Sequence, residues 1–432
     1  MPNEEPSTFN EDLLKNLEED LGKFGSDSHK LIQDFVPYNE STIWDFSDSY
    51  YKSKGIMAWS NKVSKIIPHK IGTNYQSAIA FAKLVKVNLE KFPSDERIQV
   101  LEAGAGSARF SRHFLLALKE LGIQDRVQLI ISDYSSCNLD SINSAGILEG
   151  FTEDEDYMFQ CVDITKAEDL AGLKPRAIFM HYVLDALPLT IIRKNEKIEE
   201  LLISSSIRKE QELDVLQNEF LQSRIEHEDK WQTYNPDSEL EKKYWEFFSN
   251  YHSDSFNREL YYSYTALDAV SKLVDSLDEN GFLLNIDILP GNERRYIVVG
   301  NSIAHEVDND LLASFMEASS NKAFVKDDRS ISRLVIAKNQ TSLTALNTKF
   351  EEVFGKGNLV REYIELEKEI ETAIEASQSS QVETKLNRLT ELAPHYAFTY
   401  ELWSCYYSLT GDDIKASEYR NKAQAIDYWD DL

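Results

Sequence analysis

The sequence contains few cysteines and no long apolar run. Its 3 cysteines in 432 residues, Cys137, Cys161 and Cys405, form no CxxC pair, so neither a disulfide framework nor a cysteine zinc site is indicated. No apolar stretch reaches the roughly 18 residues that a membrane-spanning helix needs, and the first residues lack the features of a secretion signal. The sequence therefore predicts a cytoplasmic protein with no membrane partner.

Basic residues, glycine and proline are also scarce. Lys and Arg number 46 against 74 Asp and Glu, a formal net charge of −28, which works against attraction to phosphate backbones. We therefore expect no nucleic-acid partner. The 8 histidines show no HExxH or paired spacing, so no metal site is expected. With 16 Gly and 10 Pro, the composition is that of a packed globular protein, and the length predicts two or three domains.

The apolar pattern divides the chain into three parts. Residues 1–90 show helical periodicity with aromatic clusters and no alternating strand pattern, so we expect a helical N-terminal region whose aromatic residues mostly pack. Residues 91–338 alternate helical stretches with short apolar runs, at 98–104, 127–132, 157–163, 177–183, 282–288, 296–300 and 333–338. This alternation predicts an α/β fold with a mostly parallel sheet and helices on both faces. Residues 339–432 show only helical periodicity.

Two segments of the middle part depart from the alternation. Residues 189–204 contain two β-rich stretches around a polar turn, a pattern typical of a hairpin. Residues 208–280 are acidic, aromatic and helical, and they form an insertion longer than an ordinary crossover. We interpret this insertion as a lid or a substrate wall.

The C-terminal part carries a spaced set of small and aromatic residues. Pro394 precedes Gly411 by 17 residues, Ala416 follows the glycine by 5, and Ala423 follows by 7 more, with Tyr407 four residues before the glycine. This spacing resembles the helical hairpin of tetratricopeptide repeats. We expect a tetratricopeptide-like domain that binds a protein substrate or partner; an unrelated helical bundle is the alternative.

An apolar strand runs into a glycine-rich turn and then a helix. Gly104 and Gly106 allow a ligand to approach the backbone closely, and the N–H groups of Ala105 and Ser107, near the helix start, can face that ligand. A dinucleotide fingerprint would need a third glycine where Arg109 stands. An ordinary tight turn between strand and helix is the alternative to a binding site.

Acidic residues stand at the ends of three consecutive expected strands. Glu102, two residues before the first glycine, suits the cationic amino group of S-adenosylmethionine. Asp133, followed by Tyr134, can accept hydrogen bonds from both ribose hydroxyls. Asp163, followed by Ile164, can accept from an adenine amino group. Because ligands of open α/β sheets bind outside the carboxyl ends of the strands, these acids together predict one cofactor site.

The fourth expected strand leads into the segment HYVLDALP. His181 and Asp185 are candidates to orient or deprotonate a methyl acceptor, and Tyr182 is a candidate wall or hydrogen-bond donor. Methyl transfer from a sulfonium is an in-line displacement, so alignment and the exclusion of water are the main demands on the protein. The alternatives are that Asp185 caps the next segment and that His181 packs.

The motifs EAGAGSARF, ISDYS and HYVLDALP, the last followed by a hairpin, resemble the class I S-adenosylmethionine-dependent methyltransferases, and most closely the MidA-like group. The segment 67–74 is similar to that group's cofactor-covering loop, which implies a cofactor contact at Thr73. Two positions depart from the group, because Ala108 replaces a glycine and His181 stands where asparagine is usual. The resemblance spans about residues 40–338 and implies a Rossmann-like sheet, S-adenosyl-L-methionine as cofactor, and methylation of protein side chains, arginine in particular.

Two other functions fit the same sequence. A small-molecule or lipid methyltransferase would use the insertion at 208–260 as its pocket. A non-catalytic assembly or interaction protein could have retained the cofactor fold, because a fold does not fix a function.

Overall fold

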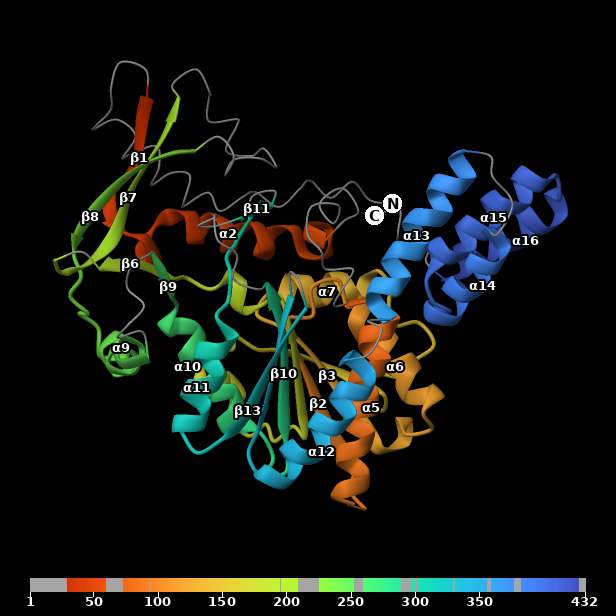
Figure 1. Cartoon of the computed structure of the whole chain (residues 1–432), viewed down its shortest axis with the longest axis horizontal. Coiled ribbons are helices and arrows are strands. Elements are labelled where there is room, and N and C mark those ends of the chain that lie inside the picture. Colours follow the sequence, from red (N-terminus) through yellow and green to blue (C-terminus); the bar gives the residue numbers. More distant parts are fainter. Residues whose placement is uncertain are drawn as a thin grey trace.

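The computed structural model describes residues 29–59, 73–93, 95–194, 196–208, 225–251, 259–288, 297–299, 302–328, 331–355, 359–376 and 382–426. A seven-stranded sheet lies at the centre, with helices on both of its faces (Figure 1). A second, antiparallel sheet lies at the upper left of Figure 1, and the C-terminal helices lie at the right. Among the helices of the described residues, none is both long and apolar enough to cross a membrane.

The central sheet has the strand order β13-β14-β10-β5-β2-β3-β4. Parallel pairing joins the five strands from β10 to β4, and β14 runs antiparallel to both β10 and β13. The strands are β2 (Ile98–Ala103), β3 (Val127–Asp133), β4 (Tyr157–Cys161), β5 (Ala177–His181), β10 (Phe282–Ile288), β13 (Lys322–Asp328) and β14 (Ile331–Ala337). The expected α/β fold with a mostly parallel sheet is confirmed, and six of its strands lie where the sequence predicts them.

Successive residues of the central strands enter opposite hydrophobic cores. Val100 of β2 packs under one layer of helices, and the next residue, Leu101, packs under the other. The first layer contains α5 (Tyr75–Lys91), α6 (Arg109–Glu120), α7 (Ser136–Ser144) and α12 (Gln340–Phe350). The second contains α8 (Ala167–Leu170), α9 (Glu239–Tyr251), α10 (Tyr264–Ser276) and α11 (Asn309–Ala318). Both faces of the sheet are therefore covered, which explains the continuous apolar runs of its strands.

Side-chain caps set the first residues of several of these helices. The side chain of Asn74 accepts the Ser77 N–H at the start of α5, and that of Ser135 accepts the Asn138 N–H at the start of α7. Each cap satisfies a backbone donor that has no partner within the helix. The start of α7 is therefore fixed directly beyond the end of β3.

The second sheet carries the expected hairpin. Strands β6 (Thr190–Lys194) and β7 (Ile198–Arg208) pair antiparallel, and β1 (His29–Pro37), β8 (Glu226–Thr233) and β9 (Leu260–Tyr262) complete the sheet. One of its faces packs on helix α2 (Thr42–Lys54) and strand β12 (Ser302–Ala304) in a separate apolar cluster that includes Trp44, Ile191 and Ile203. The second sheet therefore supports α2.

The prediction of an entirely helical N-terminal region is wrong for β1. This strand pairs with β7, which lies about 170 residues further along the chain, and its register shifts twice, between Leu31 and Gln33 and between Gln33 and Val36. Such irregularities break the alternation of apolar residues by which a strand is recognised in a sequence.

The insertion at 208–280 is not wholly helical either. Helices α9 and α10 are present, but β8, with the sequence EHEDKWQT, is a strand of mostly exposed polar residues. Its strand conformation comes from pairing with β7 rather than from an apolar pattern. Residues 209–224 of the insertion lie outside the described residues.

Two further strands differ from expectation. The run at 296–300 does contain a strand, β11 (Ile297–Val299), but it pairs with β12 in a separate ribbon outside the central sheet. Strand β13 has the sequence KAFVKDD, whose polar residues interrupt the apolar pattern by which a strand is predicted. It forms the edge of the central sheet beside β14.

Four helices form the C-terminal unit: α13 (Leu359–Glu375), α14 (Val382–Leu392), α15 (Ala397–Thr410) and α16 (Asp413–Ile426). Gly411 ends α15 with a left-handed φ of 81°, and Ala416 and Ala423 are buried where α16 packs on α15. The apolar cluster of this unit is separate from the cores of the sheet. Its assignment to the tetratricopeptide class remains a prediction.

The expected boundary at residue 339 is placed too early. Leu346 and Phe350 of α12 are buried in the same core as α5 and the central strands. The Phe350 ring contacts Phe324 of β13 at a centroid distance of 5.2 Å. Helix α12 therefore completes the sheet domain, and the separate C-terminal cluster begins with α13.

Phe350→Ala should lower the free energy of unfolding by about 3–5 kcal/mol, because it leaves a cavity beside the sheet. Ile414→Ala is the control, since Ile414 is 84% exposed on α16. Chemical denaturation of both variants measures the difference. A loss below about 1 kcal/mol for Phe350→Ala would contradict the inclusion of α12 in this core.

Candidate active site

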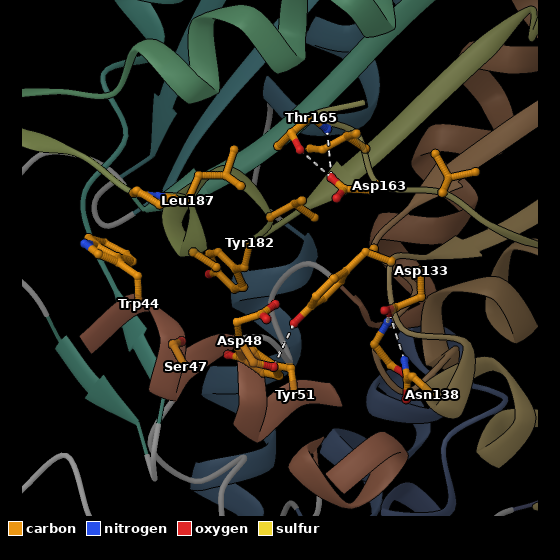
Figure 2. A pocket seen from close by; sticks show the side chains of 18 of the residues that line it. Trp44, Ser47, Asp48, Tyr51, Asp133, Asn138, Asp163, Thr165, Tyr182 and Leu187 are labelled. Carbon is orange, nitrogen blue, oxygen red and sulfur yellow. Dashed lines mark hydrogen bonds between the residues drawn. The ribbon is translucent and has the colours of Figure 1, made fainter. Parts of the chain in front are cut away.

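A cavity of about 370 Å³ lies at the carboxyl ends of strands β2, β3, β4 and β5 (Figure 2). Four kinds of segment form its walls: the glycine turn after β2, the residues after β3 and β4, the end of β5 with the 3-10 turn η4 (Leu184–Ala186), and helix α2. The sequence predicts that the glycine turn and the ends of β3, β4 and β5 meet, and they do meet around this cavity. Helix α2 joins them unexpectedly.

The glycine turn leaves no space for a side chain. Gly104 has φ of +76°, and a Cβ atom at this position would lie 2.6 Å from Cγ2 of Val183. Gly106 has φ of +54°, and its N–H donates to Oδ2 of Asp133 over 3.3 Å. Both glycines line the cavity. Glycine is therefore required at Gly104 by backbone conformation and by space.

The other expected residues of this turn have different surroundings. The Ala105 N–H donates to the Ser132 carbonyl over 2.8 Å, so the fold already uses that donor. Neither Ala105 nor Ser107 is among the described residues that line the cavity. Ala108, which stands in place of a glycine, has φ of +55°, a conformation that costs an alanine about 1–2 kcal/mol.

Glu102 lies buried at the end of β2, and its carboxyl group accepts a hydrogen bond from the Ser111 hydroxyl of α6. It is not among the described residues that line the cavity. Burial raises its pKa to about 8 despite that hydrogen bond, and the neighbouring charge of Asp133 adds to the rise. At neutral pH the group is therefore mostly protonated, and a nearby cation would favour its ionised form.

Asp133 lines the cavity from the end of β3 and is almost fully buried. Its Oδ1 accepts the Ser135 N–H at 3.0 Å, and its Oδ2 accepts from the Asn138 side chain at 2.8 Å. Burial raises its pKa, and these hydrogen bonds oppose the rise. The adjacent Tyr134 also lines the cavity, and its hydroxyl donates to the backbone carbonyl of Asp48 in α2 over 3.4 Å.

Asp163 and Ile164 line the cavity just beyond β4. Oδ1 of Asp163 accepts from the N–H and the hydroxyl of Thr165, at 3.0 and 2.6 Å, and Lys166 lies 3.2 Å from Oδ2. Burial alone would raise the pKa of Asp163, but these hydrogen bonds outweigh it, so the pKa lies below its usual value. This carboxylate is therefore ionised and held in a local turn.

His181 and Tyr182 line the cavity at the end of β5, with ring centroids 4.0 Å apart. Tyr182 has a left-handed φ of 52°, and its N–H donates to the Ile286 carbonyl of β10 over 3.0 Å. Burial, with the charges of Asp287 and Asp185, raises the pKa of Tyr182 far above neutrality. Tyr182 is therefore a hydrogen-bond donor, not a base, and its strained backbone is of a kind that clusters at functional sites.

Asp185 lies in η4 and is 3% exposed, but it is not among the described residues that line the cavity. Burial raises the pKa of its carboxyl group. Its backbone carbonyl accepts the His305 N–H over 2.9 Å. The segment that carries His181 thus reaches the cavity, while Asp185 lies beneath the surface of that segment.

Helix α2 supplies a wall that the sequence analysis did not identify. The cavity is lined by Trp44, Ser47, Asp48 and Tyr51 (Figure 2), and also by Asp45. The spacing of positions 44, 48 and 51 puts them on one helix face, which is the signal that could have been noticed. The interpretation of the N-terminal aromatic residues as mostly packing holds for the buried Phe46 and Tyr50 but is incomplete for Trp44 and Tyr51.

The expected covering loop is only partly described, since residues 67–72 lie outside the described residues. Thr73, at its end, is not among the described residues of the cavity lining. Its carbonyl accepts from Nδ1 of His113, at 2.9 Å. Burial lowers the pKa of His113 to about 4, so its ring is neutral at pH 7.

No group of three or more His, Cys, Asp or Glu in the described part of the chain is arranged to hold a metal ion. Beyond the expected residues, the cavity is also lined by Asn138, Val162, Thr165, Val183, Ala186, Leu187 and Pro188.

The family model described as "Putative S-adenosyl-L-methionine-dependent methyltransferase" matches residues 80–319, more than half of the chain. This match includes the glycine turn, the ends of β3, β4 and β5, and the helices α10 and α11. It does not include α2 or the C-terminal helices. A comparison with curated proteins found no match.

Several solved structures align with most of this chain. A Burkholderia thailandensis protein bound to S-adenosyl-homocysteine is 12% identical, with 78% of this chain and 95% of that chain covered and a TM-score of 0.48. A native structure from the same organism is 13% identical, with the same shares covered and a TM-score of 0.49. The B. thailandensis 1,6-didemethyltoxoflavin-N1-methyltransferase is 11% identical, with 73% and 98% covered and a TM-score of 0.34.

Glu102→Gln should change how the stability of the protein depends on pH. In the unfolded chain this carboxyl group has a pKa near 4.5, whereas in the folded protein it is about 8. Between these values the unfolded state binds fewer protons, so wild-type stability falls as pH rises, by up to about 1.4 kcal/mol per pH unit. The Tm of Glu102→Gln relative to wild type should therefore increase from pH 5 to pH 8.

The exposed Glu246 of α9 offers a matched control, because Glu246→Gln removes the same charge at the surface. A pH-independent difference between Glu102→Gln and wild type would show that Glu102 is ionised in the folded protein.

Proposed function

This chain belongs to the family of S-adenosyl-L-methionine-dependent methyltransferases, and we propose that it methylates a side chain of a protein, with arginine favoured by the resemblance to the MidA-like group. The observation that carries the proposal is the cavity itself. The glycine turn and the buried Asp133 form one side of it, and helix α2, with its aromatic and acidic side chains, forms the other. Such a cavity offers one side to a nucleoside and the other to a cationic acceptor.

The residues present fit S-adenosyl-L-methionine. At Gly104 there is no room for a Cβ atom, so the backbone itself faces the cavity. The carboxylate of Asp133 lies in the wall as an acceptor suited to hydroxyl groups, and Tyr134 and Ile164 supply flat or apolar surface beside it. The cofactor supplies an electrophilic methyl group on a sulfonium. We propose that Gly104, Gly106, Asp133, Tyr134, Asp163 and Ile164 hold it.

Four residues that the sequence predicts at the cofactor do not line the cavity, and we do not propose that they contact the cofactor directly. Glu102 lies beneath the turn, where its ionised form would be favoured by the amino group of the cofactor. Ala105 and Thr73 would support the turn and the segment leading to α5 through their hydrogen bonds to Ser132 and His113, and Ser107 lies in the turn without lining the cavity.

The acidic side of α2 supports a cationic acceptor. Asp45 and Asp48 lie one helical turn apart, and both face the cavity. Partial burial raises the pKa of Asp45, and the charge of Asp48 adds to that rise. An incoming guanidinium or ammonium group would favour the ionised form of Asp45, and the rings of Trp44 and Tyr51 offer faces that attract cations.

For the chemistry, we propose that His181 and Tyr182 contact the acceptor. The hydroxyl of Tyr182 stays protonated at neutral pH and can donate a hydrogen bond, so His181 is the candidate to accept a proton. Asp185 would act through this segment, because its own carboxyl group is buried below the cavity surface. In this proposal the wall formed by α2 limits the access of water to the reacting groups.

We further propose that the C-terminal helices capture the protein substrate or a partner. They form an apolar cluster of their own, and they contact the sheet domain where the Gln76 side chain donates to the Leu392 carbonyl and His395 packs on the ring of Tyr75. Helical units of this kind present surfaces to proteins.

Gly104→Ala should weaken the binding of S-adenosylhomocysteine at least tenfold, because the added Cβ atom would collide with Val183 and displace the turn. Titration calorimetry measures the affinity. Gly122→Ala is the matched control, since Gly122 has a similar φ of +65° with nothing within 4 Å of the new atom. Unchanged binding in Gly104→Ala would remove the turn from the cofactor site.

The function itself is tested by methyl transfer. Purified protein, tritium-labelled S-adenosyl-L-methionine and a cell lysate are incubated, separated by size, and the labelled protein is hydrolysed for amino-acid analysis. We expect label in a protein band and in methylated arginine. His181→Ala should reduce this transfer about 10²-fold while the affinity for S-adenosylhomocysteine stays within a few-fold.

Other outcomes decide against parts of the proposal. Label only in small molecules or lipids would overturn the protein acceptor and favour that alternative. Cofactor binding without any transfer would favour a non-catalytic assembly protein. Equal losses of transfer and affinity in His181→Ala would assign His181 to the cofactor.

A further inference from the structure

Asn138 lies between the glycine turn after β2 and Asp133 at the end of β3. These are two of the segments proposed above to hold the cofactor. Asn138 is in the first turn of α7, directly beyond β3, and is 3% exposed. Its backbone N–H donates to the capping hydroxyl of Ser135 over 3.2 Å. The cap and the helix therefore fix the position of its backbone before any side-chain contact is considered.

The side-chain amide of Asn138 links two different segments (Figure 2). Its Nδ2 donates to Oδ2 of Asp133 and also to the backbone carbonyl of Gly106, each over 2.8 Å. An amide group has two N–H donors, and here one goes to each partner. A single side chain thus holds the acid at the end of β3 against the glycine turn after β2.

Hydrogen bonds on both oxygens constrain the direction of the Asp133 carboxylate. Ser135 holds Oδ1 through its N–H, and Asn138 and Gly106 hold Oδ2. A carboxylate held in this way cannot rotate about its terminal torsion without breaking a bond. The hydrogen bond from Asn138 also opposes the rise in the pKa of Asp133 that burial causes, and so favours the ionised, accepting form.

We propose that Asn138 is a positioning residue for cofactor binding, which aims the Asp133 carboxylate at the ribose hydroxyls and ties it to the glycine turn. The inference rests on the proposed function, because it assumes a nucleoside in this cavity. Removal of the amide leaves the buried Gly106 carbonyl without this donor, and it leaves Oδ2 of Asp133 with the longer, 3.3 Å hydrogen bond from the Gly106 N–H. The acid remains present but is held less firmly in the binding direction.

The test is the affinity for S-adenosylhomocysteine and for its 2′-deoxy and 3′-deoxy analogues, measured by titration calorimetry. Asn138→Ala should weaken S-adenosylhomocysteine about tenfold or more. In wild type, loss of a ribose hydroxyl that Asp133 binds should weaken binding about tenfold. In Asn138→Ala, removal of the same hydroxyl from the ligand should weaken binding only about threefold or less, because the carboxylate no longer holds that hydroxyl well.

Asn143→Ala is the matched control, because Asn143 is exposed on the same helix. It should bind all three ligands as wild type does. Asn138→Leu keeps the volume of the side chain without its donors and serves if the alanine variant is unstable. The variant Asp133→Ala, combined with Asn138→Ala, should be little weaker than Asp133→Ala alone if the amide acts through the acid.

The outcomes separate this inference from the proposed function. If wild type fails to bind S-adenosylhomocysteine, the proposed function fails and the positioning role with it. If wild type binds but Asn138→Ala binds equally well, the positioning role is overturned and the function stands. If Asn138→Ala weakens the parent ligand and both deoxy analogues by the same factor, Asn138 is only structural, and the proposal is also overturned.

Discussion

Parallel pairing of β2, β3, β4 and β5 brings their carboxyl ends to a single edge of the central sheet, and the candidate site depends on this constraint. Chain that leaves a strand at this edge must turn before the returning helix, so each turn offers backbone and side-chain groups to the same space. The glycine turn, Asp133, Asp163 and His181 are far apart in the sequence but share this cavity. Both faces of the sheet are buried under helices, so packing fixes where those strand ends lie.

Acidic groups at this edge are kept in different states by their surroundings. Glu102 is deeply buried with one hydroxyl donor, so its pKa rises to about 8. Asp163 accepts several hydrogen bonds and lies beside Lys166, so its pKa falls. Asp133 lies between these cases, because burial raises its pKa and backbone and amide donors oppose the rise. One edge of the sheet thus combines a neutral acid with an ionised one.

The second sheet determines how the cavity is closed. Its first strand, β1, comes from the N-terminal part of the chain, and its other strands come from the middle part. Together with β12, this sheet packs against α2. Trp44 belongs to both structures, since it packs in that cluster, donates from Nε1 to the Tyr38 carbonyl over 2.8 Å, and lines the cavity. The Tyr134 hydroxyl connects α2 to the wall after β3. Helix α2 therefore joins the second sheet to the cavity wall after β3.

The sequence by itself determined the features that depend on local pattern. Apolar runs located six strands of the central sheet, and the glycine pair and the acids at strand ends located three walls of the cavity, because these signals need only neighbouring residues. Tertiary structure alone decided what depends on distant pairing. Strand β1 and the polar strand β8 exist because β7 offers them hydrogen bonds, and α12 belongs to the sheet domain because Phe350 finds a core there. Likewise, Asp185 carries a plausible catalytic side chain that burial removes from the cavity surface, whereas Asp48 and Asn138 reach the cavity because packing brings α2 and α7 to it. Local spacing can group side chains on one face of a helix, as it does for α2, but the whole fold decides what that face meets and which side chains are buried.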